Sequence, residues 1–461
     1  MRRRIAEETI LFISVAKWIF MATIVGVIVG FSTAFFIKIL VWSSQFAKNY
    51  QYYFLLLPVA LVLSELLVKY LAPDARGHGT EKVIEAIHKH SGRIKISVVP
   101  VKLLATIITL AAGGSVGKEG PCAQIGAGLT SLLADLFKFG DKDRKKLVIC
   151  GISAGFAAVF GTPISGAIFG VEVLFAGAIV YDVLLPSFVA GITAYQVARM
   201  FGITYFYHPL QFVPVFSETF FLKVILAGVF FGLCSGFLIE SLKIGERLAL
   251  KIKLGTVLKA FLGGIILIIL TLIFSKQFLG LGLNSIETAL QGTRMPWYAF
   301  IMKSIFTSIT LSFGGSGGIV TPIFFVGAAA GSLFAVILGL DIATFSAIGL
   351  VSLLAGAANT PISASIMSVE LFGPRLAPYA TIACVISFLM TGHRSVYPSQ
   401  ILAVSKSASI EVEVGRELED IRAIYKPRKK SLITSVAKIL KKAGQMLRDR
   451  AKKQKANRKG T

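Results

Sequence analysis

The carboxylate of Glu119 stands out because it lies in a glycine-rich motif whose second copy in the chain lacks an acid. Residues 113–121 read Gly-Gly-Ser-Val-Gly-Lys-Glu-Gly-Pro, and residues 314–322 read Gly-Gly-Ser-Gly-Gly-Ile-Val-Thr-Pro. At the matched position the second copy has Val320. An ionisable side chain at the mouth of an apolar helix is costly, and in membrane segments such groups are functional by default. The asymmetry therefore predicts that the chemistry of the chain lies at Glu119.

Each glycine-rich motif precedes an apolar helix that the sequence predicts to begin near Pro121 or Pro322, since proline suits a first helical turn. The first N–H groups of a helix lack partners, and the helix dipole favours negative charge there. Two such helix starts that meet near mid-membrane can replace the hydration of an anion without a full basic charge. They predict an anion site. The backbone groups expected to hold the anion belong to Gly117, Lys118, Gly120, Ile319, Val320 and Thr321.

The sequence calls for no cofactor and no metal. The first motif is superficially similar to a nucleotide-binding loop, but Ala112 takes the place of the first glycine of that pattern, and Glu119 that of the magnesium-binding Ser or Thr. No strand is predicted before it. The four cysteines are isolated in apolar surroundings, so they are expected to be small core residues rather than a disulfide frame or a metal site.

A second pair of segments repeats at nearly the same spacing. Residues 162–165 and 360–363 both read Thr-Pro-Ile-Ser, and each is followed by a glutamate, Glu172 or Glu370. Because the glutamate occurs in both copies, we expect a structural role for it, such as accepting hydrogen bonds at a helix end. Matched signatures in two apolar, glycine-rich halves indicate a transporter built from internal repeats, with its binding site between them.

The composition of the 461 residues predicts a protein that crosses a membrane several times. Hydrophobic residues make up 55% of the chain and the mean hydropathy is +0.75, which is too apolar for a soluble multidomain protein. Several apolar runs are too long for one span or too short to cross, so helices of about 20 residues must be mixed with tilted or broken ones. The predicted fold class is an all-α integral membrane protein of two inverted-topology repeats.

The net charge of +24 is concentrated near the two ends of the chain. Arginines occupy positions 2–4, and residues 426–461 form a dense run of Lys and Arg with one acid, Asp449. Positive flanks mark cytoplasmic ends, so both termini are expected in the cytoplasm, and two inverted repeats give the even number of crossings that this requires. The basic tail suits anionic lipid headgroups. Nucleic acid, the other partner of such a charge, is not expected.

These features divide the chain into five parts. We expect a cytoplasmic N-terminus over residues 1–9, a first transmembrane repeat over 10–204, a linker over 205–217, a second repeat over 218–405 and a basic cytoplasmic tail over 406–461. Lys102 and Lys223 fall inside apolar segments, where their side chains are expected to snorkel to the membrane surface. His88 and His90 are expected on a solvated helix face.

Together the motifs resemble those of the CLC chloride channels and chloride/proton antiporters, of the prokaryotic type without appended regulatory domains. The family's GxxxGREGP motif is similar to residues 113–121, with Lys118 in place of arginine, and its GxFxP motif to residues 318–322, with Val320 in place of phenylalanine. Its GSGIP motif is matched in part by residues 77–81, where His78 replaces the serine. The family's late pore tyrosine resembles Tyr397.

The resemblance implies a homodimer in a prokaryotic cytoplasmic membrane, with one pore per subunit for chloride or a similar small monovalent anion. It implies that Glu119 is the gating glutamate, which occupies the anion path and leaves when protonated, and that His78 and Tyr397 border the inner side of the pore. The family's internal proton-carrying glutamate falls at Val173, which cannot carry a proton. We therefore expect passive, channel-like conduction. The alternative is proton-coupled exchange with a displaced relay, through Glu172 or through water near Val173.

Two other functional classes fit the sequence less well. An intramembrane enzyme would need a second catalytic group beside Glu119, such as His78 or His88, at a fixed spacing, and neither repeat provides one. A structural or lipid-scrambling protein would not explain glycine-rich helix starts in both halves. The chain is therefore expected to move an anion rather than to catalyse a reaction.

Overall fold

The computed structural model describes residues 2–205, 208, 210, 217–421 and 424–425. This part of the chain is almost entirely helical and contains sixteen α-helices in two series of eight. The first series is α1 (Arg2–Lys48), α2 (Leu57–Leu71), α3 (Thr80–Lys89), α4 (Val98–Ala111), α5 (Glu119–Leu136), α6 (Asp141–Phe160), α7 (Pro163–Glu172) and α8 (Leu184–Met200). The second is α9 (Glu218–Lys251), α10 (Thr256–Ile273), α11 (Leu283–Leu290), α12 (Ala299–Ser312), α13 (Val320–Leu338), α14 (Ile342–Ala358), α15 (Pro361–Phe372) and α16 (Ala377–Thr391).

Short elements connect these helices. Four strands of two residues each are β1 (Phe175–Ala176), β2 (Ile401–Leu402), β3 (Ile410–Glu411) and β4 (Ile424–Tyr425). The described 3₁₀ turns are η1 (Tyr53–Leu56), η2 (Pro73–Ala75), η3 (Tyr181–Val183), η4 (Lys276–Phe278) and η5 (Pro374–Leu376). Strand β1 pairs with β2 in parallel, and β3 pairs with β4 antiparallel.

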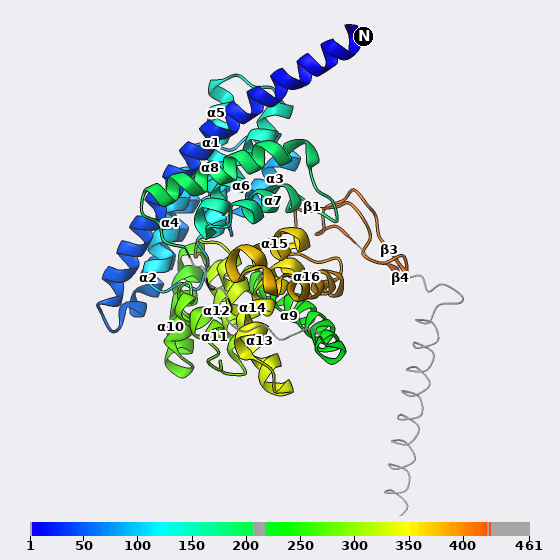
Figure 1. The fold of residues 1–461 in the computed structure, drawn as a ribbon. Helices are drawn as coiled ribbons and strands as arrows, with labels where there is room; N and C mark the ends of the chain where they lie inside the picture. Colours follow the sequence, from blue (N-terminus) through cyan, green and yellow to red (C-terminus); the bar gives the residue numbers. More distant parts are fainter. Residues whose placement is uncertain (1, 206–207, 209, 211–216, 422–423, 426–461) are drawn as a thin grey trace, which may run out of the picture.

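The two series of helices have the same internal packing. Helix α1 lies along α8 and α6, and its counterpart α9 lies along α16 and α14, while α5 packs on α6 as α13 packs on α14. In Figure 1 the first series forms the upper part of the body and the second series the lower part. The predicted all-α membrane fold with an internal repeat is confirmed.

Glycine or asparagine ends a helix, and proline begins the next one, at equivalent positions of the two repeats. Gly161 ends α6 in the left-handed conformation at φ 74°, and Asn359 ends α14 at φ 57°. These two residue types tolerate that conformation best. Pro163 and Pro361 then stand in the first turns of α7 and α15, where the missing N–H costs nothing. The same local chemistry thus breaks the chain twice at equivalent points.

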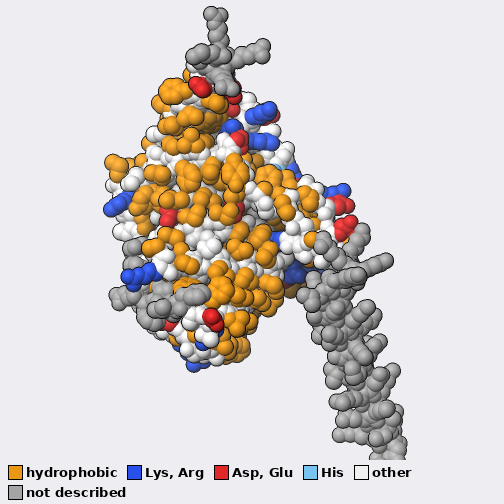
Figure 2. All heavy atoms as spheres, turned by 45° about the vertical axis from the view of Figure 1, so that its right-hand side comes forward, with side chains coloured by type: hydrophobic (Ala, Val, Ile, Leu, Met, Phe, Trp, Pro, Cys, Tyr) orange, Lys and Arg blue, Asp and Glu red, His pale blue; other side chains and the backbone are white. Residues whose placement is uncertain are grey.

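Seven helical segments of the described chain are long and apolar enough to cross a membrane. They are Ala6–Lys48, Tyr53–Leu71, Tyr181–Met200, Glu218–Lys251, Thr256–Ile273, Val320–Leu338 and Pro374–Thr391. Helices α3, α7, α11 and α15 have only 8 to 12 residues, so the predicted mixture of spanning and broken helices is present. Figure 2 shows hydrophobic side chains over much of the visible face, with charged ones mainly towards its margins.

The structure shows the local conformation at both ends of the predicted parts. Helix α1 begins at Arg2, so residues 2–9 continue the first spanning helix. Most of the predicted linker, and the basic run over 426–461, lie outside the described residues. Residues 406–421, predicted as the start of the tail, fold back onto the body. There Lys406 Nζ donates to Asn359 Oδ1 at 2.6 Å and to the Phe388 carbonyl at 2.7 Å.

Candidate functional site

The two glycine-rich turns meet in the interior of the protein. Gly117 and Gly318 exchange both backbone hydrogen bonds, each with an N to O distance of 2.6 Å. Only glycine fits at this crossing, because a Cβ on Gly318 would lie 2.7 Å from the Gly120 nitrogen. Since α5 and α13 begin directly after these turns, their N-termini lie next to each other.

Side chains from α4 and α12 hold the turns in a crosswise arrangement. The Ser115 N–H donates to the Thr310 hydroxyl, and the Ser316 N–H donates to the Thr109 hydroxyl, both at 3.1 Å. Each helix therefore satisfies a backbone group of the other repeat. The contact joins two turns that are about two hundred residues apart in sequence, which rigidifies the floor of the site.

The Glu119 carboxylate fills the space at the N-terminus of α13. The Thr321 N–H donates to its Oε2 at 3.1 Å, and the Thr321 hydroxyl donates to its Oε1. The Glu119 side chain has no exposed surface, and a Cβ on Gly117 would collide with Oε2. Within the described residues no Lys or Arg is paired with this carboxylate, so helix-end N–H and hydroxyl groups stabilise it.

His78 and Tyr397, which the sequence assigned to the inner side of the pore, lie side by side. Their ring centroids are 5.6 Å apart. The His78 carbonyl oxygen lies so close to Gly120 that a Cβ there would be 2.0 Å from it, which connects the His78 loop to the start of α5. The His78 Nδ1 atom is buried and has no hydrogen-bond partner in the described chain. That the two side chains border an anion path stays a prediction.

The remaining residues of the predicted anion site line the same junction. Ile319, Val320 and Thr321 are buried, with exposed fractions of 1% or less. Lys118 is half-buried and directly precedes α5. Val320 supplies an apolar wall where the first repeat has Glu119, so the described junction contains a carboxylate from one repeat only.

Lys102 does not snorkel, and this prediction is wrong. Its side chain is fully buried, and Nζ donates to the carbonyls of Ala75 at 3.1 Å and Gly77 at 2.5 Å. Lys303 in the second repeat does the same with Phe278 at 3.1 Å and Gly280 at 2.7 Å. Each ammonium group thereby fixes the loop that precedes α3 or α11.

Glu172 and Glu370 cap each other's repeat. Glu172 accepts from the N–H groups of Ile362 at 3.0 Å and Ser363 at 2.8 Å, at the start of α15. Glu370 accepts from Ile164 at 2.9 Å and Ser165 at 2.8 Å, at the start of α7. All four carboxylate oxygens are thus used in helix capping, as expected of a glutamate with a structural role.

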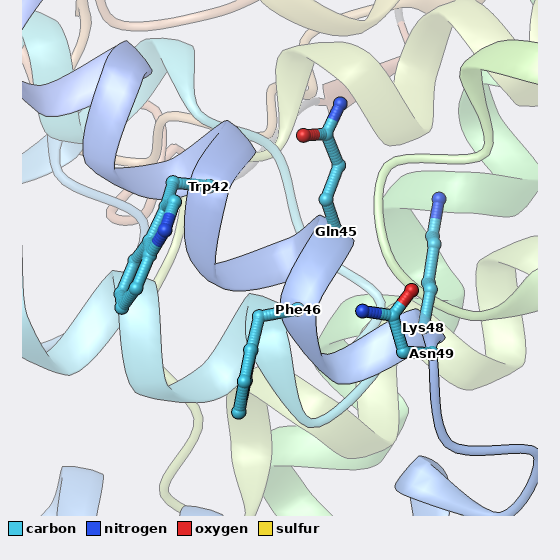
Figure 3. Close-up of a pocket in the computed structure, with 5 residues that line it drawn as sticks. All are labelled: Trp42, Gln45, Phe46, Lys48 and Asn49. Carbon is cyan, nitrogen blue, oxygen red and sulfur yellow. The ribbon is translucent and has the colours of Figure 1, made fainter.

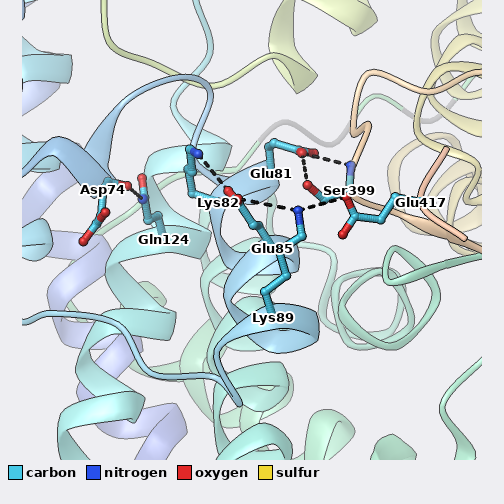
Figure 4. A network of polar contacts seen from close by, with 8 residues as sticks. All are labelled: Asp74, Glu81, Lys82, Glu85, Lys89, Gln124, Ser399 and Glu417. Carbon is cyan, nitrogen blue, oxygen red and sulfur yellow. Dashed lines mark hydrogen bonds and ion pairs between the residues drawn. The ribbon is translucent and has the colours of Figure 1, made fainter. Parts of the chain in front are cut away.

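Ion pairs lie within α3, and another connects α3 with the C-terminal segment (Figure 4). Lys82 lies 2.7 Å from Glu85, and Lys89 lies 3.0 Å from Glu417. The hydrogen bond from Lys82 holds the pKa of Glu85 below its ordinary value, and the hydrogen bond to Glu417 raises the pKa of Lys89. His88, expected on a solvated face, instead lies with Nε2 3.1 Å from the Leu174 carbonyl oxygen, while His90 is exposed.

Three functional contacts were not predicted from the sequence. Thr321 was expected to contribute only its backbone N–H group, so its hydroxyl was missed. Glu81 and Gln400 were not singled out. Gln400 Nε2 donates to the carbonyls of Val173 at 2.7 Å and Ala358 at 2.8 Å, which joins the ends of α7 and α14. For Glu81 a signal existed, since it follows His78 within the same motif. Gln400 carries no such signal.

No group of three or more potential metal ligands occurs among the described residues. All four cysteines are buried and unpaired. A shallow depression at the end of α1 is remote from the helix-start junction in sequence, and Figure 3 shows its lining residues Trp42, Gln45, Phe46, Lys48 and Asn49. Trp42 and Phe46 are exposed and stacked at 6.0 Å, as is common at a lipid–water boundary.

Comparison with known proteins gives one consistent result. The family described as voltage gated chloride channel matches residues 59–392. A chloride/fluoride channel protein of Pseudomonas syringae pv. tomato is 35% identical over 410 residues, which cover 87% of this chain and 90% of that protein.

Two solved structures share the fold. The crystal structure of a CLC-type fluoride/proton antiporter superposes with a TM-score of 0.80 at 27% identity, covering 84% of this chain and 98% of that one. A slow cyanobacterial chloride/proton antiporter gives a TM-score of 0.70 at 22% identity, covering 81% of this chain and 94% of that one. At this lower identity the likeness concerns the fold alone.

Proposed function

The chain belongs to the voltage-gated chloride channel (CLC) family of anion transport proteins, and from this premise we propose that it exchanges a small monovalent anion for protons across the membrane. Exchange is the alternative that the sequence left open beside passive conduction. It is favoured by the fluoride/proton antiporter, which resembles this chain over 84% of its length.

The observation that supports the proposal most is the position of the Glu119 carboxylate at the start of α13, here called its seat. The N–H and hydroxyl of Thr321 hold it at the start of α13, where a helix N-terminus suits any anion of similar charge. A halide that binds there must displace the carboxylate. In this proposal Glu119 is the gate, and it competes with the transported anion for the N–H groups at the start of α13, while the Thr321 hydroxyl holds the carboxylate alone.

The surroundings of Glu119 favour protonation of its carboxylate when an anion displaces it. The side chain is fully buried, and a carboxylate that leaves its hydrogen-bond donors for an apolar environment pays several kcal/mol, by rough estimate, unless it is neutralised. Protonation neutralises it and breaks its attraction to the helix end. Anion binding and proton binding to Glu119 are then linked, which is the physical basis of coupled exchange.

For the transported anion we propose fluoride together with chloride. The bacterial relative carries both anions in its name, and the structural relative carries fluoride. Fluoride is small and strongly hydrated, so it needs several short hydrogen bonds in exchange for its water. The proposed seat offers the backbone N–H groups at the start of α13, among them that of Thr321, while His78 would contribute on the inner side.

Passive conduction remains a second candidate because of Val173. This residue is apolar and fully buried, where the family resemblance implies an internal proton-carrying glutamate. The name of the Pseudomonas syringae relative, a channel protein, also favours it. The two candidates differ in one measurable quantity, the protons moved for each anion.

Flux measurements in reconstituted liposomes distinguish exchange from passive conduction. Fluoride leaving and protons entering both move positive charge inward, so valinomycin and potassium must be present to balance it. Under these conditions an outward fluoride gradient across vesicles that start at equal pH should drive protons inward and acidify the interior, recorded with a pH-sensitive dye while a fluoride electrode follows the anion. Glu119→Gln should abolish the proton movement and leave fluoride efflux. Fluoride efflux from unmodified protein under the same conditions, without proton movement, would establish a channel.

We also propose that the chain acts as a homodimer in a prokaryotic cytoplasmic membrane with both termini in the cytoplasm. The apolar exterior and the family support a multi-pass membrane protein. The basic residues at both ends of the chain support a cytoplasmic position of both termini. Cysteine labelling at position 9 or 421 in intact cells tests the orientation, and cross-linking tests the dimer.

A further inference from the structure

Coupled exchange needs a route for protons between Glu119 and the side of the protein on which residues 401–421 pack, which the sequence predicts to be cytoplasmic. Val173 offers no titratable group. Glu172 has no free carboxylate oxygen, because both of its oxygens accept hydrogen bonds from N–H groups of α15. A relay at the position implied by the family is therefore missing, and another acid has to be found nearer the pore.

Glu81 is the acid that the structure provides. It is the second residue of α3 and follows the His78 loop directly. Its Oε1 accepts from the Ser399 N–H at 2.9 Å and from the Ser399 hydroxyl. Its Oε2 is buried and has no hydrogen-bond partner in the described chain. A buried carboxylate oxygen without a donor is costly as an anion, whereas a protonated one can donate to water.

Glu81 lies between the pore residues and the face of the protein on which residues 401–421 pack. On one side, Glu81 is bound by Ser399, which follows Tyr397 by two residues, and the His78 ring lies 5.6 Å from the Tyr397 ring. On the other side, Figure 4 shows Glu81 beside Ser399, and Lys89, two turns later on α3, pairs with Glu417 of the C-terminal segment at 3.0 Å.

The pKa of Glu81 suits a group that must both take up and release protons. Helix α3 is short and amphipathic and is not one of the spanning helices. Burial raises the pKa of Glu81 to about 7, while the hydrogen bonds from Ser399 and the charge of Lys82 lower it and the charge of Glu85 raises it. Protonated and ionised forms would then both be populated near neutral pH.

Comparison of the two repeats separates function from structure at this position. The Gly77 and Gly79 turn has its counterpart at Gly280 and Gly282, all with positive φ, and Lys102 and Lys303 hold Gly77 and Gly280 alike. In this register His78 matches Leu281 and Glu81 matches Asn284. The matched position of α11 thus has no acid, although α11 begins in the same way. Like Glu119, it occurs in one repeat only.

We infer that Glu81 is the inner proton relay of this transporter, a titratable side chain that passes protons between Glu119 and the face on which residues 401–421 pack. This rests on the proposed exchange function. In one direction the O–H bond of protonated Glu81 breaks as an O–H bond forms on a pore water, which gives up a proton to the Glu119 carboxylate. The Glu81 carboxylate then takes a proton from the aqueous side. No electrons move, and water is the only co-reactant.

The experiment measures proton and fluoride flux together in liposomes for Glu81→Gln. The amide keeps an oxygen acceptor for Ser399 but cannot release a proton. Proton flux should fall about 100-fold, the lower end of what a positioned proton-transfer group contributes, while fluoride flux stays within about threefold. Glu81→Asp, which keeps an acid, should retain most of the proton flux. The matched control is Glu85→Gln on the same helix, which should leave the proton-to-fluoride ratio unchanged.

The failures are distinguishable. Unmodified protein that moves fluoride without protons defeats the exchange function itself. Exchange that persists unchanged in Glu81→Gln overturns the relay and leaves Glu81 as a tether for Ser399. Loss of coupling in both Glu81→Asp and Glu81→Gln, reproduced by Ser399→Ala, would also overturn it, because the tether rather than the proton would then matter.

Discussion

Thr321→Val tests whether Glu119 competes with the anion for the donors at the start of α13. Valine has the shape and β-branching of threonine and keeps the backbone N–H that bonds Glu119 Oε2 at 3.1 Å. It removes only the hydroxyl that donates to Oε1. The substitution therefore weakens the hold on the carboxylate without opening the helix.

The expected size of the effect follows from the contact that is lost. A hydrogen bond to a charged group contributes about 1.5–3 kcal/mol net, and Glu119 Oε1 is left in a fully buried position, which adds to the loss. The carboxylate should vacate its seat more readily by roughly 10- to 100-fold. An anion that competes for the seat should then bind more tightly by a similar factor, and the pH at which Glu119 takes up a proton should rise.

Fluoride titration of detergent-purified protein by isothermal calorimetry measures this affinity, and a double-mutant cycle with Glu119→Gln isolates the pair. Thr321→Val should tighten binding in the parent and have little effect when Glu119 is already neutral. Equal weakening of fluoride binding in both backgrounds would refute the competition, because the hydroxyl would then be a ligand of the anion itself.

Three further substitutions test other parts of the site. His78→Ser should change the relative flux of fluoride, chloride and nitrate in liposomes, because His78 packs on Tyr397 at 5.6 Å; unchanged ratios would exclude it from the path. Glu370→Ala leaves two N–H groups at the start of α7 without acceptors and should lower the free energy of unfolding by about 2 kcal/mol, seen as earlier thermal unfolding than in the exposed control Glu413→Ala. Burial lowers the pKa of Lys406 from 10.5 to about 7, so the unfolded chain binds an additional proton between these values and stability should rise with pH there; Lys406→Met should flatten that rise in thermal unfolding, and an unchanged slope would assign it to another group.

The repeat, the helix starts and the position of Glu119 as an acid at one helix start only could be predicted because they depend on local rules. Glycine and proline fix where a helix begins, and comparison of two copies in one chain reveals a lone acid without any structure. The expectation that Glu172 and Glu370 cap helix ends followed from the same comparison. What the comparison could not give was the partner, since each glutamate caps a helix of the other repeat.

The errors concern contacts between residues far apart in sequence. Lys102 was expected to snorkel because hydropathy cannot distinguish a lysine that reaches the surface from one whose acceptors are carbonyls some 25 residues earlier. The assignment of residues 406–421 to the tail stays a prediction, but their mixed charge could not show that Lys406 donates to Asn359 Oδ1 and to the Phe388 carbonyl. The Thr321 hydroxyl could not be found either, because its partner lies 202 residues away.

The reciprocal contacts between the repeats have a consequence for how the protein is made. When the first half leaves the ribosome, α7 has no cap, Glu172 has no helix to hold, and Ser115 has no acceptor, since the partners are 190 to 206 residues later in the chain. A membrane offers those polar groups no water as a substitute. The first half must therefore wait, shielded by lipid headgroups or by the insertion machinery, until the second half has been synthesised. Neither half can mature first, and chains truncated between the halves should be degraded rather than accumulate as a stable domain.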